Sequence, residues 1–499
     1  MIASATFQED FYHRLGLPPG ADEALIRRQY RRLARLLHPD TGAQTHQSAE
    51  FLAIQEAYDI LSDPIKRRDY DRWLREQGLF PPFHADILHG PHVLRATNSP
   101  QRLYMLLELR AREEAANRPP TINLVLVVDQ SSSMRGERLF QVRQAARMVA
   151  ERLGADDYLS IVAFNDWADI VLPAQHRPSP TTLMEALNKL QASGGTEIAR
   201  GLEAGFSEAQ KFHTPGVVTQ IVLLTDGNTY GDEDRCIALA QRAAAHNMSM
   251  TLLGIGTEWN DRLLDKMADI SGGQSYFLRE PRDILRVFEE QLKNLRTTIA
   301  SHVDLTITTP DESEVLSVYE VSPGLKRITP QDDGAYVLGA LYNKPARRVL
   351  IDLKLTIDQD RRVVLPAVFE IEARIIGQTR PIRLRLTTPL NVESVSESKL
   401  DYPEEVIEAA RRAVISRLQE QAWEALEKGD VEQAEAHLAL LVDRFLELGE
   451  RNLAQLAEKE LSRLRTTGEL SPEGTLELKY GTRMLALPAP QTHQSSEGA

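Results

Sequence analysis

The chain contains a single cysteine, Cys236, among 499 residues. One thiol excludes intrachain disulfides and every cysteine-rich zinc module, and it fits a reducing compartment. No apolar run approaches the roughly 20 residues that cross a bilayer, and the first residues lack the pattern of a secretory signal. Basic residues are not in excess, because 58 Lys and Arg face 72 Asp and Glu, which gives a net charge of -14. We therefore expect a soluble, cytoplasmic protein without a membrane span and without a nucleic acid partner.

The length and composition predict several folded domains. At roughly 150 residues per domain, 499 residues correspond to about three domains. A content of 42% hydrophobic and 26% charged residues is typical of globular proteins. The patterns described below divide the chain into a helical domain (1–77), a linker and strand (78–120), an α/β domain (121–297), a β domain (298–395), C-terminal helices (400–468) and a disordered tail (485–499).

The first domain is predicted to be a helical hairpin with a strongly basic helix. Apolar residues at helical spacing predict a helix from Leu25 to Leu37, with Asp22 as its N-cap. Pro39 ends this helix, and a second amphipathic helix begins near Ala49. Arginines without any interleaved acid fill the polar side of the first helix, which is often no more than a solvated face. These arginines are Arg27, Arg28, Arg31, Arg32 and Arg35.

The turn between the two helices reads His38-Pro39-Asp40. Such a tripeptide alone is an ordinary helix-terminating turn. Together with segments 11–22, 26–40 and 51–71, however, it resembles the J-domain of DnaJ-type co-chaperones. The resemblance implies that His38, Pro39 and Asp40 engage the ATPase of a DnaK-type heat-shock chaperone and that the arginine face docks on an acidic patch. A basic helix suits a weak, rapid encounter that salt weakens.

Two features of the larger co-chaperones are missing. No Gly/Phe-rich linker follows Trp73, and one cysteine cannot build their zinc-binding client domain. We therefore expect another part of the chain to select the client proteins.

The region from Thr121 to about Leu295 alternates strand and helix patterns. Its first strand, 122–129, is almost continuously apolar, as a strand covered on both faces of a parallel sheet should be. The alternation predicts a doubly wound, Rossmann-like α/β fold. Such folds bind ligands at the carboxyl ends of their strands, so the residues after each strand are the candidates for chemistry.

Three loops after these strands carry oxygen ligands. They are Asp129-Gln130-Ser131-Ser132-Ser133, Ser193-Gly194-Gly195-Thr196 and Thr225-Asp226-Gly227. Each loop alone is commonly a helix cap or a tight turn. Together, their carboxylates and hydroxyls suit a hard divalent cation such as Mg²⁺.

The order and placement of the three loops resemble a von Willebrand factor type A (VWA) domain with a complete metal-ion-dependent adhesion site. The resemblance implies that Ser131, Ser133 and Thr196 ligate Mg²⁺ or Mn²⁺, while Asp129 and Asp226 hold waters or ligate directly. An open coordination position would then accept a carboxylate from a partner protein. The loops contain no histidine or cysteine base, so we expect binding here and do not expect an enzyme.

The rest of the chain is predicted to form a β domain and a helical region. Period-two alternation, for example in 349–357 and 382–386, predicts a β-sandwich over 298–395. The strand at 103–109 has the same character, so it is expected to join this sheet and make the α/β domain an insertion. Within 400–468, residues 423–449 loosely resemble one tetratricopeptide-type hairpin, although a simple packed helix pair is the favoured interpretation.

The functional expectation is a co-chaperone or adaptor. The J-domain would recruit and stimulate a DnaK-type ATPase, and the VWA domain would capture an unidentified target through an acidic residue. The alternative is an interaction module of a metal-dependent, chelatase-like assembly with an AAA-type ATPase, which the J-domain remodels. A co-chaperone should bind several non-native proteins, and an assembly factor one native partner.

Overall fold

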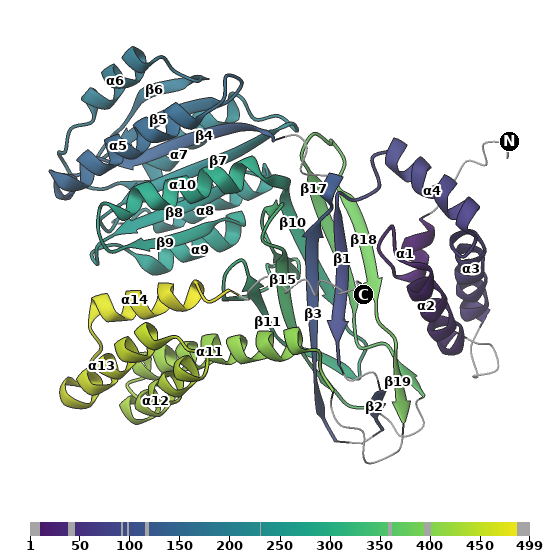
Figure 1. Ribbon diagram of the computed structural model, residues 1–499. Helices are drawn as coiled ribbons and strands as arrows, with labels where there is room; N and C mark the ends of the chain where they lie inside the picture. Colours follow the sequence, from purple (N-terminus) through teal and green to yellow (C-terminus); the bar gives the residue numbers. More distant parts are fainter. Residues whose placement is uncertain are drawn as a thin grey trace, which may run out of the picture.

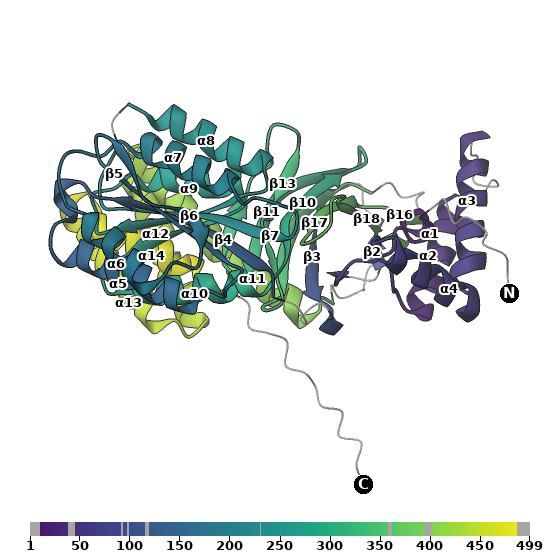
Figure 2. The same cartoon turned by 90° about the horizontal axis from the view of Figure 1, so that it is seen from above.

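The computed structural model describes residues 10–37, 45–90, 93–96, 99–114, 119–229, 231–357, 362–393 and 401–486. A helical domain and an α/β domain lie at opposite ends of the molecule, with a β domain between them and a helical bundle beside the α/β domain (Figures 1 and 2). This arrangement confirms the predicted multidomain fold class. The predicted turn of His38, Pro39 and Asp40 lies outside the described residues, as does most of the predicted tail, from 487 onward.

The N-terminal domain is helical. In α2 the side chain of Asp22 accepts a hydrogen bond from the amide of Leu25, so Asp22 is the N-cap, as predicted. The core of the domain includes Tyr12, Ile26, Leu61 and Tyr70. Its helices are α1 (Phe11–Leu15), α2 (Glu23–Leu36), α3 (Thr45–Leu61) and α4 (Pro64–Glu76).

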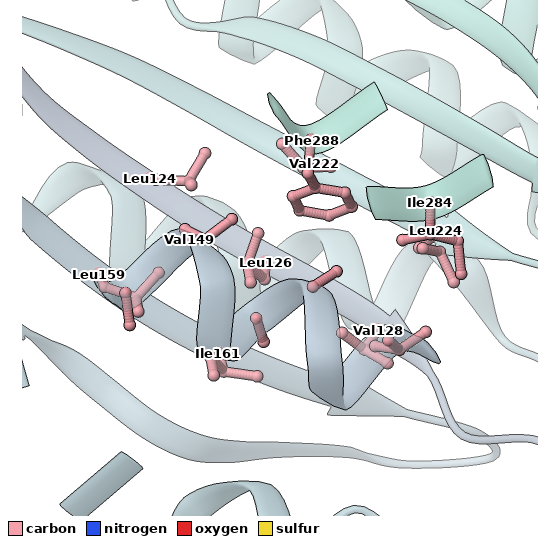
Figure 3. Packing of buried hydrophobic residues seen from close by; sticks show 14 of the residues in the cluster. Leu124, Leu126, Val128, Val149, Leu159, Ile161, Val222, Leu224, Ile284 and Phe288 are labelled. Carbon is pink, nitrogen blue, oxygen red and sulfur yellow. The ribbon is translucent and has the colours of Figure 1, made fainter. Parts of the chain in front are cut away.

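The α/β domain is a six-stranded sheet in the order β6-β5-β4-β7-β8-β9, in which only β6 runs antiparallel. Residues of α5, α6 and α10 cover one face and residues of α7, α8 and α9 the other. Figure 3 shows Leu126 of β4 in the core with Val149 of α5 and Phe288 of α10. The elements are β4 (Thr121–Asp129), η3 (Ser132–Met134), α5 (Glu137–Arg152), β5 (Tyr158–Phe164), β6 (Ala168–His176), α6 (Pro180–Lys189), α7 (Ile198–Gln210), β7 (Val217–Thr225), α8 (Glu233–Ala245), β8 (Ser249–Ile255), α9 (Asp261–Ser271), β9 (Gln274–Leu278) and α10 (Asp283–Arg296).

The β domain is built from two main sheets whose apolar faces share one core. The first has the order β1-β3-β15-β11-β12, and the second contains β13-β10-β17-β18 with β14 paired to β10. Strand β3 precedes the α/β domain and pairs antiparallel with β15, so the α/β domain is inserted into the β domain. The strands are β1 (Phe83–His89), β2 (Val93–Arg95), β3 (Gln101–Ala111), β10 (Thr298–Thr308), β11 (Ser313–Ser322), β12 (Lys326–Ile328), β13 (Ala335–Val337), β14 (Leu341–Tyr342), β15 (Arg347–Leu355), β16 (Val363–Val364), β17 (Val368–Ile375), β18 (Ile382–Thr387) and β19 (Leu390–Glu393).

The C-terminal helices extend beyond the predicted end at residue 468. They are α11 (Glu404–Glu427), α12 (Val431–Glu447), α13 (Arg451–Thr467) and α14 (Pro472–Arg483). Helix α14 escaped prediction because it is short and contains Gly474 and Gly481, which weaken helical propensity. Both glycines lie against α13, where an added Cβ would collide with Glu460 or Leu453. Tertiary packing therefore requires the two residues that make this helix hard to recognise.

The helical N-terminal domain is docked on strand β18. The Nε2 of Gln29 in α2 donates to the carbonyl oxygen of Thr387 at 2.9 Å and to its Oγ1 at 2.8 Å. The amide of Thr387 donates to the carbonyl oxygen of Gly16 at 3.0 Å. Gln29 is buried in this contact, so its amide group depends on Thr387 for hydrogen bonding.

We expect Gln29→Ala to loosen this docking. The substitution removes two buried hydrogen bonds, which contribute about 1–3 kcal/mol when a buried partner is left unsatisfied. Hydrogen exchange measured by mass spectrometry should increase in β18 and in the α2 face that meets it. Arg31→Ala changes an exposed residue of the same helix and should leave exchange in β18 unchanged. Equal protection of β18 in all three proteins would contradict the prediction.

Candidate metal centre and basic helix

Four of the five predicted metal-site residues lie in one hydrogen-bonded group at the carboxyl ends of β4 and β7. These strands are adjacent and parallel, so the loops that follow them meet at one edge of the sheet. The hydroxyl oxygens of Ser131 and Ser133 are 2.9 Å apart, and Ser133 donates to Oδ1 of Asp226 at 2.7 Å. Asp129 accepts from the amide of Ser131 at 2.7 Å through Oδ1.

The fifth residue, Thr196, lies beside the turn that follows β7. A Cβ added to Gly227 would be 3.2 Å from Oγ1 of Thr196, so a side chain there would crowd Thr196. Two residues that were not predicted as ligands form hydrogen bonds to the loop that carries Thr196. Asn165 donates through Nδ2 to the carbonyl of Ser193 at 2.9 Å, and Asp166 accepts from the amide of Gly195 at 3.0 Å.

Asn165 and Asp166 were missed by the sequence reasoning. The available signal was a pair of short polar residues directly after strand β5, the same placement as that of the loops after β4 and β7. The loop that carries Thr196 does not follow a strand, because it lies between α6 and α7. Arg138 was also missed. Its guanidinium forms an ion pair with Oδ2 of Asp226. Nothing in the local sequence around Arg138 indicates this pairing, because it depends on how α5 is turned toward the sheet.

Both carboxylates of the site are removed from solvent. Asp129 and Asp226 are 0% and 1% exposed. Burial raises the pKa of Asp129 to about 6, and hydrogen bonds from Thr225 and Ser131 oppose this rise. Oδ2 of Asp129 accepts from Thr225 Oγ1 at 2.6 Å, so a residue of β7 orients the carboxylate that ends β4.

The donor set fits a hard divalent cation. All the converging side-chain atoms are carboxylate or hydroxyl oxygens, which Mg²⁺ and Mn²⁺ prefer. Two carboxylates would neutralise a bound dication without filling its coordination sphere, so an open position would remain for a further oxygen ligand. Within the described residues no three His, Cys, Asp or Glu side chains gather into a metal cluster. The predicted site has two carboxylates and three hydroxyls, so it contains fewer than three of these side chains.

The arginines of α2 differ in exposure. Arg27, Arg28, Arg31 and Arg35 are exposed, and Arg32 is half-buried. Arg28 and Arg32 line a cavity of about 420 Å³ between α2 and the β domain. Burial lowers the pKa of the Arg32 guanidinium, and the positive charges of Arg28 and Arg35 lower it further. Four of the five arginines of the predicted docking face are thus open to solvent.

Comparisons with known families identify the domains that carry these residues. Residues 10–71 match the DnaJ domain family, and residues 123–290 match the von Willebrand factor type A domain family. The chain contains a DnaJ domain and a VWA domain. Residues 404–488 match a third family, described as the Sll0103-like C-terminal alpha-helical domain. This match includes α14 and extends past the predicted helical region.

Individual relatives cover parts of the chain. An uncharacterized protein sll0103 of Synechocystis is 32% identical over 256 residues, which are 50% of this chain and 61% of the relative. A chaperone protein DnaJ of Synechococcus elongatus is 48% identical over 67 residues, 13% of this chain and 23% of the relative. The chain thus spans less than two thirds of either relative.

Much of the fold recurs in a solved structure. The von Willebrand factor type A protein from Catenulispora acidiphila superposes with a TM-score of 0.67 at 19% identity, over 82% of this chain and 98% of that one. At this identity the likeness concerns the fold. Among the described residues, no helix is both long and apolar enough to pass through a bilayer.

Proposed function

We propose that this protein is a co-chaperone or adaptor that brings a DnaK-type chaperone to a target held by its VWA domain. His38, Pro39, Asp40 and the basic face of α2 would engage and stimulate the DnaK-type ATPase. The observation that carries the proposal is the presence, in one chain, of a DnaJ domain and a VWA domain whose loop oxygens converge at the carboxyl ends of β4 and β7.

The VWA domain would select the target through a divalent metal. Asp129, Ser131, Ser133, Thr196 and Asp226 would hold Mg²⁺ or Mn²⁺, which supplies an electrophilic position for a carboxylate of the target. Burial of Asp129 favours this role, because a bound cation would offset the cost of that buried carboxylate. The contacts from Thr225, Asn165 and Asp166 would keep the ligand loops in place.

The two domains lie in one chain, which would keep the recruited chaperone close to the bound target. A target held at the VWA domain raises the local concentration of the chaperone around itself without any new chemistry. The three loops contain no histidine or cysteine base, so we propose a binding role and not an enzymatic one. We place this activity in the cytoplasm, where a DnaK-type partner and free Mg²⁺ would meet the protein.

The DnaJ half of the proposal is tested by the ATPase rate of a purified DnaK-type chaperone with the full chain added. Wild type should stimulate single-turnover hydrolysis, and His38→Gln should remove most of that stimulation. His13→Gln, in α1 of the same domain, should stimulate as wild type does. Stimulation should also fall with added salt, because the encounter uses exposed arginines. Equal rates with wild type and His38→Gln would refute the proposed chaperone contact.

A further inference from the structure

Arg138 contacts two of the proposed metal ligands. It is the second residue of α5, and its guanidinium forms an ion pair with Oδ2 of Asp226. The same guanidinium donates to the carbonyl oxygen of Ser133 at 3.3 Å. The side chain of Asp226 is 0% exposed, whereas that of Arg138 is 34% exposed. One end of the pair is therefore fixed in the site, and the other reaches solvent.

The position of Arg138 is unfavourable for α5 itself. The first turn of a helix has a positive dipole end, so a cation there is repelled and an anion is preferred. The buried Asp226, conversely, needs a positive partner, because an isolated buried carboxylate is costly. Each charge thus compensates for the cost of the other. Arg138 supplies to Asp226 the positive charge that a metal ion would otherwise supply.

We propose that Arg138 is an internal counter-ion that competes with the divalent metal for Asp226. This inference rests on the proposed metal site. A guanidinium and a dication both next to one carboxylate repel each other, so loading of the metal requires the Arg138 head group to leave Asp226. Its partial exposure gives it a route, since the head group can move into water while its stem stays on α5.

The consequence is a metal site whose affinity is set below what its oxygens alone would give. Capture of an acidic target then depends on two linked exchanges. The metal replaces the guanidinium at Asp226, and the carboxylate of the target replaces a water on the metal. The carboxylate of the target and Arg138 attract each other, so the released guanidinium is placed to contact the bound anion.

The test is isothermal titration of the full-length chain with MgCl₂. Arg138→Gln should bind Mg²⁺ about tenfold more tightly than wild type, because one positive charge beside the ligands is lost. Arg138→Lys keeps the positive charge, so its affinity for Mg²⁺ should increase less than that of Arg138→Gln. Arg135→Gln makes the same change of net charge at an exposed residue just before α5. It should bind Mg²⁺ as wild type does. An affinity of Arg138→Gln equal to or weaker than that of wild type would overturn the inference.

A measurement on wild type avoids any failure of the variant to fold. The Nη1–H signals of Arg138, which make both of its contacts, should be protected from exchange with water before Mg²⁺ is added and exposed afterwards. They are assigned by their absence from the Arg138→Lys spectrum. Unchanged protection at saturating Mg²⁺ would also overturn the inference. Asp129→Asn separates the two proposals: if it binds Mg²⁺ as wild type does, or if wild type does not bind at all, the metal site itself is wrong. If only wild type binds, the metal site stands and Arg138 alone is being tested.

Discussion

Asp129→Asn should weaken Mg²⁺ binding more than about 100-fold, since loss of even an outer partner of a ligand costs 10–100-fold. The amide keeps the shape of the side chain and the hydrogen bond from the amide of Ser131. What is lost is one of the two buried negative charges that would attract the metal. Isothermal titration with MgCl₂ on the full-length chain measures the effect.

The fold should survive this substitution. Burial raises the pKa of Asp129 to about 6, so the charged form is costly in the metal-free protein, and a neutral amide relieves that cost. The metal-free melting temperature should therefore be equal to or higher than that of wild type. Asp169→Asn removes an exposed carboxylate from β6 and makes the same change of net charge. Its affinity for Mg²⁺ should stay at the wild-type value, and a matching loss in both variants would contradict the assigned site.

Asp265→Ala should destabilise the contact between the VWA domain and α14 by about 3–5 kcal/mol, as removal of one partner of a buried ion pair does. Asp265 lies in α9 and accepts from both terminal nitrogens of Arg483, at 2.7 and 2.6 Å. Tyr480 donates to it at 2.8 Å, and Lys479 is 2.7 Å away. Without Asp265, two cations of α14 lose their shared partner.

Urea unfolding and limited proteolysis of α14 measure this loss. The matched control is Glu473→Gln, which removes a half-exposed carboxylate of the same helix that pairs with Arg279 at 3.1 Å. Exposed pairs contribute about 0–1 kcal/mol, so this variant should unfold almost as wild type does. An Asp265→Ala protein with wild-type resistance to protease at α14 would show that apolar packing alone holds the helix.

The same contact predicts a pH dependence. The positive charges of Arg483 and Lys479 hold the pKa of Asp265 well below its usual range, against the effect of burial. A carboxylate whose folded pKa is lowered adds stability above its unfolded pKa of about 3.9. That stability is lost as the pH falls toward the folded pKa. The difference in unfolding free energy between wild type and Asp265→Ala should therefore be full at pH 7 and smaller at pH 3.

Local sequence patterns were sufficient to predict the individual helices and strands and most residues of the candidate metal site. The apolar run that ends at Asp129 identified a buried parallel strand, and the same pattern ended at Thr225 in a second one. Parallel neighbours place their carboxyl ends at one edge, so Asp129 and Asp226 could be paired without knowing the fold in detail. Arg138 could not be paired in this way, because its contact depends on the rotation of α5 after Gly136.

The sequence by itself determined the domain types, the doubly wound sheet and the candidate ligands, since each rests on spacing within one short segment. Only the tertiary structure decided where the DnaJ domain docks, how α14 meets the VWA domain and which cation faces Asp226. Gln29 and Thr387 are 358 positions apart, and Asp265 and Arg483 are 218 apart. Such contacts involve one or two polar side chains on each partner, without any periodic pattern. Folding brings them together through the burial of larger apolar surfaces, and their hydrogen bonds then form because leaving a buried polar group unpaired is costly.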